Sequence, residues 1–108
     1  MFVPDRGDIV YLDFNPQTGR EQAGRRPALV LSPKRFNEKT GYASVCPISE
    51  TTRKWGFHVE LPEDLAVRGV VITDQIKNLD FKARHATFEI KVPDEVVTEC
   101  LKKIRTFL

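Results

Sequence analysis

A chain of 108 residues, 41% of them hydrophobic, has the size of a single domain and enough apolar side chains for a core, which excludes a two-domain enzyme and a disordered chain. The formal net charge of +2 does not by itself indicate nucleic-acid binding. The first residues already include Pro4, Asp5 and Arg6, and no apolar run approaches the roughly 18 residues of a membrane span, so we expect a cytoplasmic protein without a membrane segment.

Three strands are expected in the first half of the chain, because three runs are rich in β-branched, aromatic and other apolar residues. They span residues 8–13, 26–32 and 42–49. The second run has a proline near its start and is otherwise densely apolar, which is typical of a central strand. A short helical turn at 34–40 is expected to stop at Gly41. Polar loops at 14–24 and 50–56 join these elements, and the first is long enough to be functional.

The second half is predicted to add short strands and to end in a helix. Apolar residues alternate over 57–61, which indicates a half-buried strand, and 69–73 is predicted as a buried strand continuing into 74–78 and then 81–90. The last apolar residues recur at helical spacing, with acidic residues before them and basic residues after them. These residues are Val97, Leu101, Ile104 and Leu108. The chain therefore predicts a mainly β fold with a C-terminal α-helix, arranged as a small twisted β-barrel.

Basic residues gather in one segment of the chain. Between Arg20 and Lys54 there are eight basic and three acidic residues, a local charge of +5. A near-neutral protein with one basic segment fits a partner that carries phosphate groups, although a solvated charged face is the commoner cause of a charge run.

No metal or cofactor site is expected from the sequence. His58 and His85 are isolated, and Cys46 and Cys100 lie far apart among apolar neighbours, which indicates reduced thiols. The chain contains no phosphate-binding glycine loop and no nucleophile motif. Any chemistry would therefore rely on arginine, hydroxyl and carboxylate side chains.

The segment 21–32, EQAGRRPALVLS, brings a carboxylate and two arginines to the start of a buried strand. With Gly7-Asp8 before it and Asp74-Gln75-Ile76-Lys77 after it, this block resembles the MazF/PemK family of toxin endoribonucleases, and the resemblance runs over residues 1–108 as one domain. It implies an SH3-like barrel, a homodimer and metal-independent cleavage of single-stranded RNA through the 2′-hydroxyl. The implied products carry 2′,3′-cyclic phosphate and 5′-hydroxyl ends. A cognate antitoxin with an acidic segment is implied to inhibit the toxin, and the complex of the two to bind DNA.

The resemblance also implies catalytic roles. The family's catalytic arginine precedes a proline and corresponds to Arg26, while its hydroxyl partner corresponds to Ser49, or to Thr51 if the register slips. Glu21 matches the glutamate of the family's first loop. A guanidinium can bind phosphate oxygens as their charge grows, and a hydroxyl can donate to them. Arginine stays protonated, so Glu21 is the better candidate base, and the identity of the base stays open. Pairing of Arg26 with Glu21 on the surface is the alternative.

A wider set of residues is expected to contact RNA. An aromatic ring beside cations makes a stacking platform for single strands, and Trp55 follows two cations, although a tryptophan packed under its loop is an equal alternative. Phe14 has the same two alternatives, and Arg25 is expected to contact RNA or the antitoxin. The expected RNA-binding residues are Phe14, Arg25, Thr51, Arg53, Lys54, Trp55, Gln75 and Lys77.

Two other functions are compatible with a small barrel of this kind. One is a non-enzymatic toxin resembling the CcdB-like poisons of DNA gyrase, and the first-loop motif counts against it. The other is an RNA-binding barrel without catalysis, which would bind single strands with a strong salt dependence and release no fragments.

Overall fold

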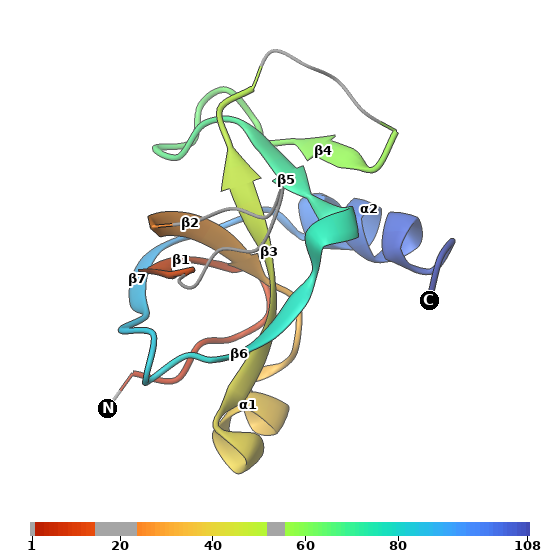
Figure 1. Ribbon diagram of the computed structural model, residues 1–108. Helices are drawn as coiled ribbons and strands as arrows, with labels where there is room; N and C mark the ends of the chain where they lie inside the picture. The colour runs from red at the N-terminus through yellow and green to blue at the C-terminus, as the bar shows by residue number, and fades with distance from the viewer. Residues whose placement is uncertain (1, 15–23, 52–55) are drawn as a thin grey trace.

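The computed structural model describes residues 2–14, 24–51 and 56–108 and shows a strongly bent antiparallel sheet with helices packed around it (Figure 1). Within these residues the elements follow one another in the order β1 (Asp8–Asp13), β2 (Arg25–Val30), α1 (Lys34–Thr40), β3 (Tyr42–Ser49), β4 (His58–Glu60), β5 (Val70–Ile72), a 3₁₀ turn (Thr73–Gln75), β6 (Lys77–Asp80), β7 (Thr87–Lys91) and α2 (Asp94–Ile104). The prediction of a mainly β fold with a C-terminal helix is confirmed.

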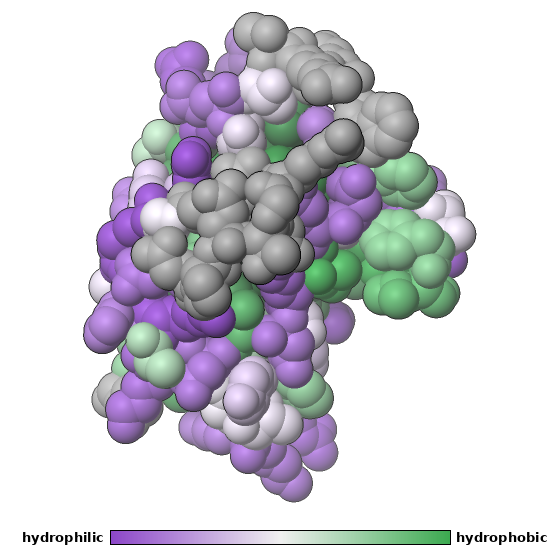
Figure 2. Space-filling model, in the orientation of Figure 1, coloured by the Kyte–Doolittle hydropathy of each residue, from purple (hydrophilic) through white to green (hydrophobic). Residues whose placement is uncertain are grey.

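Both helices occur where the sequence predicts them. α1 ends at Gly41, which adopts a left-handed conformation with φ of 77° and donates its N–H to the carbonyl of Asn37. α2 follows Pro93 and carries acidic residues in its first turn and basic residues in its last. Among the described residues, no helix has the length and apolar character needed to span a membrane. Leu108 was expected on the buried face but lies beyond the helix and is 83% exposed. Figure 2 shows apolar surface gathered at this end of α2.

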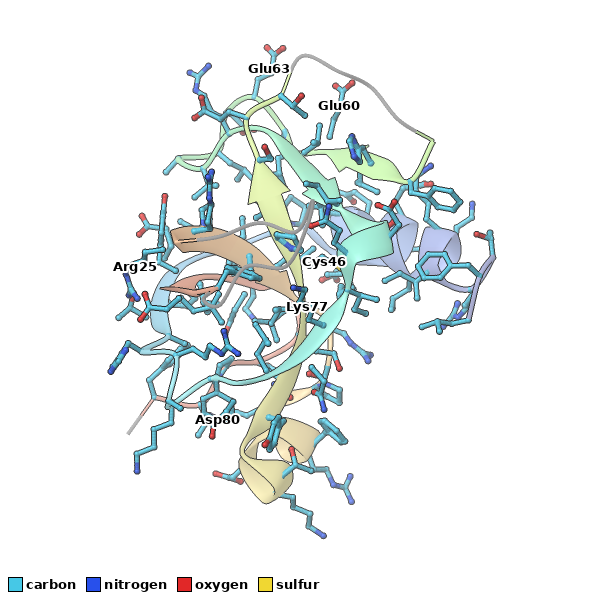
Figure 3. All side chains as sticks on the ribbon, in the orientation of Figure 1. Arg25, Cys46, Glu60, Glu63, Lys77 and Asp80 are labelled. Atoms are coloured by element: carbon cyan, nitrogen blue, oxygen red, sulfur yellow. The ribbon has the colours of Figure 1, made fainter. Side chains whose placement is uncertain are left out.

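β3 is the strand on which the sheet is organised. The order of the paired strands is β4-β5-β3-β2-β1-β7, and β6 also pairs with β3. β6, which runs from Lys77 to Asp80, follows the first half of β3, whereas β5 pairs with its last two residues (Figure 3). Because β3 changes partners along its length, the sheet curls into a barrel-like shape. Among the described residues no ladder joins β4 to β7, so the sheet stays open.

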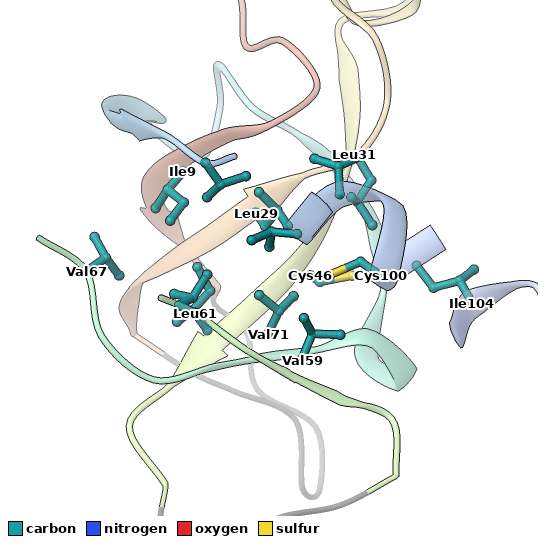
Figure 4. Close-up of a cluster of buried hydrophobic side chains, with 14 residues drawn as sticks. Ile9, Leu29, Leu31, Cys46, Val59, Leu61, Val67, Val71, Cys100 and Ile104 are labelled. Atoms are coloured by element: carbon teal, nitrogen blue, oxygen red, sulfur yellow. The ribbon is translucent and has the colours of Figure 1, made fainter. Parts of the chain in front are cut away.

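Side chains on both faces of the sheet are buried, in two clusters. The first lies between the sheet and α2 and contains Ile9, Leu29 and Cys46 with Cys100 of the helix (Figure 4). The second is enclosed by the curled sheet. Its members are Val10, Leu12, Phe14, Ala28, Val30, Ala43, Val45, Leu79 and Phe81. Alternate residues of one strand therefore enter different clusters, which explains why residues 9–12 of β1 and 28–30 of β2 are apolar without alternation.

The long strand expected after residue 69 is broken twice. After β5 the chain turns through the 3₁₀ segment, where the fully buried Thr73 donates its hydroxyl to the carbonyl of Phe57 at 2.5 Å. A second turn follows β6 and is closed by the Ala86 N–H bonded to the Phe81 carbonyl at 2.9 Å. The first break arises because the pairing with β3 changes register between Ile48 opposite Val71 and Val45 opposite Lys77, and the 3₁₀ turn takes up the extra residues.

Candidate active site

β2 brings Arg26 to the surface at the level of Ser49. The first two residues of β2 are exposed and its last three are buried, because the strand runs from the surface into the core. In the ladder between β2 and β3, Ala28 lies opposite Pro47. Continuing the same antiparallel register by two residues sets Ser49 opposite Arg26. Two side chains that are far apart in the sequence therefore come from neighbouring strands at one end of the sheet.

A polar pocket of about 350 Å³ lies beside Arg26. It is lined by Tyr11, Arg26, Pro27, Ile48, Glu50, Ala66, Val67 and Arg68. The pocket therefore gathers two guanidinium groups, one carboxylate and one phenol. One guanidinium group can bind two phosphate oxygens at once, and a carboxylate can accept a proton. These groups therefore suit chemistry at a phosphodiester.

The backbone of Gly69 packs closely against the carbonyl group of Ser49. Ser49 is the half-buried last residue of β3 and pairs with Val70 of β5. Gly69 has a φ of +122°, and a β-carbon at this position would collide with the Ser49 carbonyl. Only glycine fits here without displacing the end of β3. The position of the candidate hydroxyl thus depends on a residue that the motifs do not include.

Thr51, the alternative hydroxyl, lies beside a different pocket. That pocket measures about 220 Å³ and is lined by Thr51, Glu60, Leu61, Pro62, Glu63, Arg68, Gly69 and Val70. Arg68 belongs to the lining of both pockets, so they adjoin.

Arg25 is bound into a network on β1 and β7, away from the pocket. Its guanidinium donates to Asp13 Oδ1 at 3.2 Å, to the His85 carbonyl at 2.9 Å and to Thr87 Oγ1 at 3.1 Å. His85 Nδ1 lies 3.0 Å from Asp13 Oδ2. The His85 hydrogen bond, with Arg25 adding to it, holds the pKa of the Asp13 carboxyl below its ordinary value. Figure 3 places Arg25 at the β1–β7 side, far from Glu60 and Glu63.

The structure separates the remaining predicted RNA contacts from Arg26. Phe14 is 2% exposed inside the second cluster, so of its two alternatives the structure shows the packed ring, which fills the curled sheet. Lys77 lies opposite Val45, four residues before Ser49 on β3 and so about 13 Å along the strand. Gln75 is half-buried in the 3₁₀ turn, and its side-chain oxygen is buried without a hydrogen-bond partner among the described residues.

Four predicted site residues lie outside the described residues. These are Glu21, Arg53, Lys54 and Trp55.

Three lining residues of the Arg26 pocket were missed by sequence reasoning. Tyr11 sits in an expected strand, and Glu50 opens an expected loop. Arg68 follows an apolar residue in a turn-rich segment, and its one signal is that it is the sole Lys or Arg between residues 55 and 76.

The two cysteines are buried, and neither is suited to nucleophilic chemistry. Burial raises the pKa of the Cys100 thiol to about 12 and that of Cys46 further still, so both stay protonated. In the described part of the chain no three His, Cys, Asp or Glu residues stand close enough to hold a metal ion.

Comparisons with known proteins cover nearly the whole chain. Residues 5–108 match the family described as PemK-like, MazF-like toxin of type II toxin-antitoxin system. The endoribonuclease toxin MazF of Escherichia coli (strain K12) is 38% identical over 107 residues, which are 99% of this chain and 96% of that protein. The crystal structure of MazF from Deinococcus radiodurans has a TM-score of 0.94 and 42% identity, covering 98% of this chain and 96% of that one. A MazE-MazF crystal structure from the same organism gives a TM-score of 0.88 and 41% identity, covering 97% and 95%.

Proposed function

Because this chain belongs to the family of PemK-like, MazF-like toxins of type II toxin–antitoxin systems, we propose that it is an endoribonuclease toxin that cleaves single-stranded RNA in the cytoplasm. The observation that carries the proposal is the polar pocket beside Arg26, with Ser49 level with it on the neighbouring strand. Cleavage of messenger RNA by such an enzyme would stop translation and growth.

The proposed reaction needs no metal ion. The 2′-oxygen of a ribose attacks the adjacent phosphorus, the bond from phosphorus to the 5′-oxygen breaks, and the products are a 2′,3′-cyclic phosphate and a 5′-hydroxyl. A base takes the 2′ proton, and an acid gives a proton to the leaving 5′-oxygen. Negative charge grows on the non-bridging oxygens, where a positioned guanidinium stabilises it most.

Arg26, Ser49 and one carboxylate have roles in this proposal. Arg26 binds the non-bridging oxygens, and the Ser49 hydroxyl donates to one of them. Two carboxylates are candidates for the base. Glu21 is the one that the motif indicates, and Glu50 is the one that lines the Arg26 pocket. Arginine keeps its proton and is therefore the electrostatic partner rather than the base.

The partners of the protein are proposed on the same grounds. A homologous toxin has been crystallised with MazE, so we expect a cognate antitoxin whose acidic segment orders on the toxin surface. We also expect a homodimer. The chain exposes several large apolar side chains, and we expect a second subunit to cover some of them. They are Phe36, Tyr42, Phe88, Phe107 and Leu108.

The test is cleavage of a long unstructured RNA by the purified protein in EDTA. Discrete fragments with 5′-hydroxyl ends are expected, and sequencing those ends would give the recognised site. RNA that is bound but left intact would support the non-catalytic barrel instead. Gyrase binding without any action on RNA would support the gyrase poison.

A further inference from the structure

The pocket beside Arg26 contains a second guanidinium that the proposed reaction leaves unused. Arg68 lines this pocket and also the adjoining pocket of about 220 Å³, so it stands between two hollows in one stretch of surface. The residue is exposed, and Gly69, whose positive φ and close approach to Ser49 exclude a side chain, follows it directly. The turn that presents Arg68 is therefore the same one that holds Ser49 in place.

Arg68 is the sole Lys or Arg in the acidic stretch 55–76, and it forms no ion pair with a described carboxylate of that stretch. Between residues 55 and 76 the sequence contains no other Lys or Arg, but it contains Glu60, Glu63, Asp64 and Asp74. In the described structure no carboxylate forms an ion pair or hydrogen bond with Arg68. Glu60 and Glu63 line the adjoining pocket together with Arg68 and extend outward at the β4–β5 end of the molecule (Figure 3). The guanidinium donors of Arg68 are thus available to a ligand.

The charge of the pocket depends on Arg68. Arg26 and Glu50 together contribute no net charge, and Arg68 makes the lining positive. A nucleic acid brings one negative charge with each phosphodiester, and its binding requires positive charge in excess. With Arg26 as its one guanidinium, the pocket could bind a single phosphate beside the Glu50 carboxylate. The guanidinium of Arg68 allows a second phosphate to bind.

We propose that Arg68 binds the phosphodiester next to the one on which Arg26 acts, so that the RNA backbone passes from Arg26 to Arg68 along the rim that the two pockets share. The inference rests on the proposed endoribonuclease function and adds to it the path of the RNA. The planar fork of arginine suits two oxygens of one phosphate. Arg68 makes its contact in the ground state and in the transition state alike, so it governs binding of RNA more than the chemical step.

The test measures binding of an RNA that contains the mapped cleavage site and a single 2′-deoxynucleotide at the cut position. The Arg68→Gln substitution is expected to raise Kd about tenfold, the loss of one charge-assisted hydrogen-bonding group. It should also reduce the slope of log K against log salt by about 0.7, the share of one phosphate on a single strand. Arg68→Lys should keep the slope. On cleavable RNA, KM should rise with kcat nearly unchanged.

Arg35→Gln is the matched control, because Arg35 is an exposed arginine on α1, outside both pockets. It should leave Kd, slope and KM unchanged, and thermal unfolding should show that both variants fold. If the wild type cleaves RNA and the two variants behave alike, the role of Arg68 is wrong while the function stands. If the wild type neither binds nor cleaves RNA, both proposals fail.

Discussion

Arg25 and Arg26 are neighbours in the chain, and their surroundings differ. Successive side chains of a strand point to opposite faces, so one guanidinium enters a network with Asp13, His85 and Thr87 while the other reaches a pocket. The motif alone cannot tell them apart, because both are exposed arginines at the start of one strand. The ladder with β3 distinguishes them, since its register, continued two residues beyond Ala28 and Pro47, sets Arg26 and not Arg25 opposite Ser49.

The pKa of the Asp13 carboxyl should depend on its contacts with His85 and Arg25. Its pKa is lowered first by His85, so the contribution of this network to stability is present above the ordinary pKa near 3.8 and is lost as the pH falls through the lowered value. His85→Ala should return the pKa of Asp13 towards its ordinary value. The measurement is the pH dependence of the Asp13 carboxyl carbon shift by NMR. An unchanged titration in the variant would show that His85 does not interact with the carboxylate in solution.

At the scale of elements, the turn before β5 positions the end of β3. Gly69→Ala would place a β-carbon against the Ser49 carbonyl at a φ of +122°, so the end of β3 must move. We expect lower stability and, because small displacements at a reacting centre are costly, about 10²-fold slower RNA cleavage. Cleavage is measured below the unfolding temperature of the variant.

Gly56→Ala is the control for this substitution. Gly56 has no positive φ, and a β-carbon there meets no described atom within 4 Å. Cleavage at the wild-type rate by folded Gly69→Ala protein would mean that the position of Ser49 does not matter to the reaction.

α1 is attached to the sheet by a buried polar side chain. Asn37 is fully buried, and its amide donates to the Pro4 carbonyl at 2.8 Å and to the Ser32 carbonyl at 3.1 Å. Its side-chain oxygen accepts the Ser32 hydroxyl at 2.6 Å. Asn37→Ala would leave these groups buried without partners, at a cost of about 3 kcal/mol in the free energy of unfolding.

Urea unfolding of Asn37→Ala beside Asn78→Ala measures this cost. Asn78 is exposed on β6, and its side chain makes a 3.4 Å contact with Ser44, so its loss should change stability little. Equal destabilisation of the two variants would contradict the role given to Asn37.

Apolar periodicity and turn residues predict helix α2, strands β1 to β3 and the end of α1 at Gly41. These signals can be read in the sequence because each depends on a short stretch of chain. The break between β5 and β6 was not predictable, since it arises from the two partners that β3 takes along its length. The two alternatives for Phe14 stayed open for a related reason, because the space that its ring fills exists only once the sheet has curled. In the site, Arg26 and Ser49 came from motifs, whereas Arg68 and Gly69 matter through tertiary contacts that no local pattern encodes.

At the scale of the whole molecule, the described cations of the basic segment are dispersed, since Arg26 lines the pocket while Arg25 lies in the Asp13 network and three others belong to α1. The net charge of +2 conceals a basic segment, and the acidic stretch near β4 and β5 holds a single arginine beside the pocket. Acidic surface elsewhere opposes indiscriminate binding of phosphates. In the proposed function, the pocket and its surrounding loops both recognise and cut the RNA.

The central claim is that Arg26 supplies the electrostatic stabilisation for metal-independent RNA cleavage. Single-turnover cleavage in EDTA by wild type, Arg26→Ala and Arg35→Ala, all folded by circular dichroism, tests it directly. We expect a rate at least about 10²-fold lower for Arg26→Ala, the size of effect expected for loss of a group that stabilises transition-state charge, and no change for Arg35→Ala. Equal rates for all three proteins would contradict it.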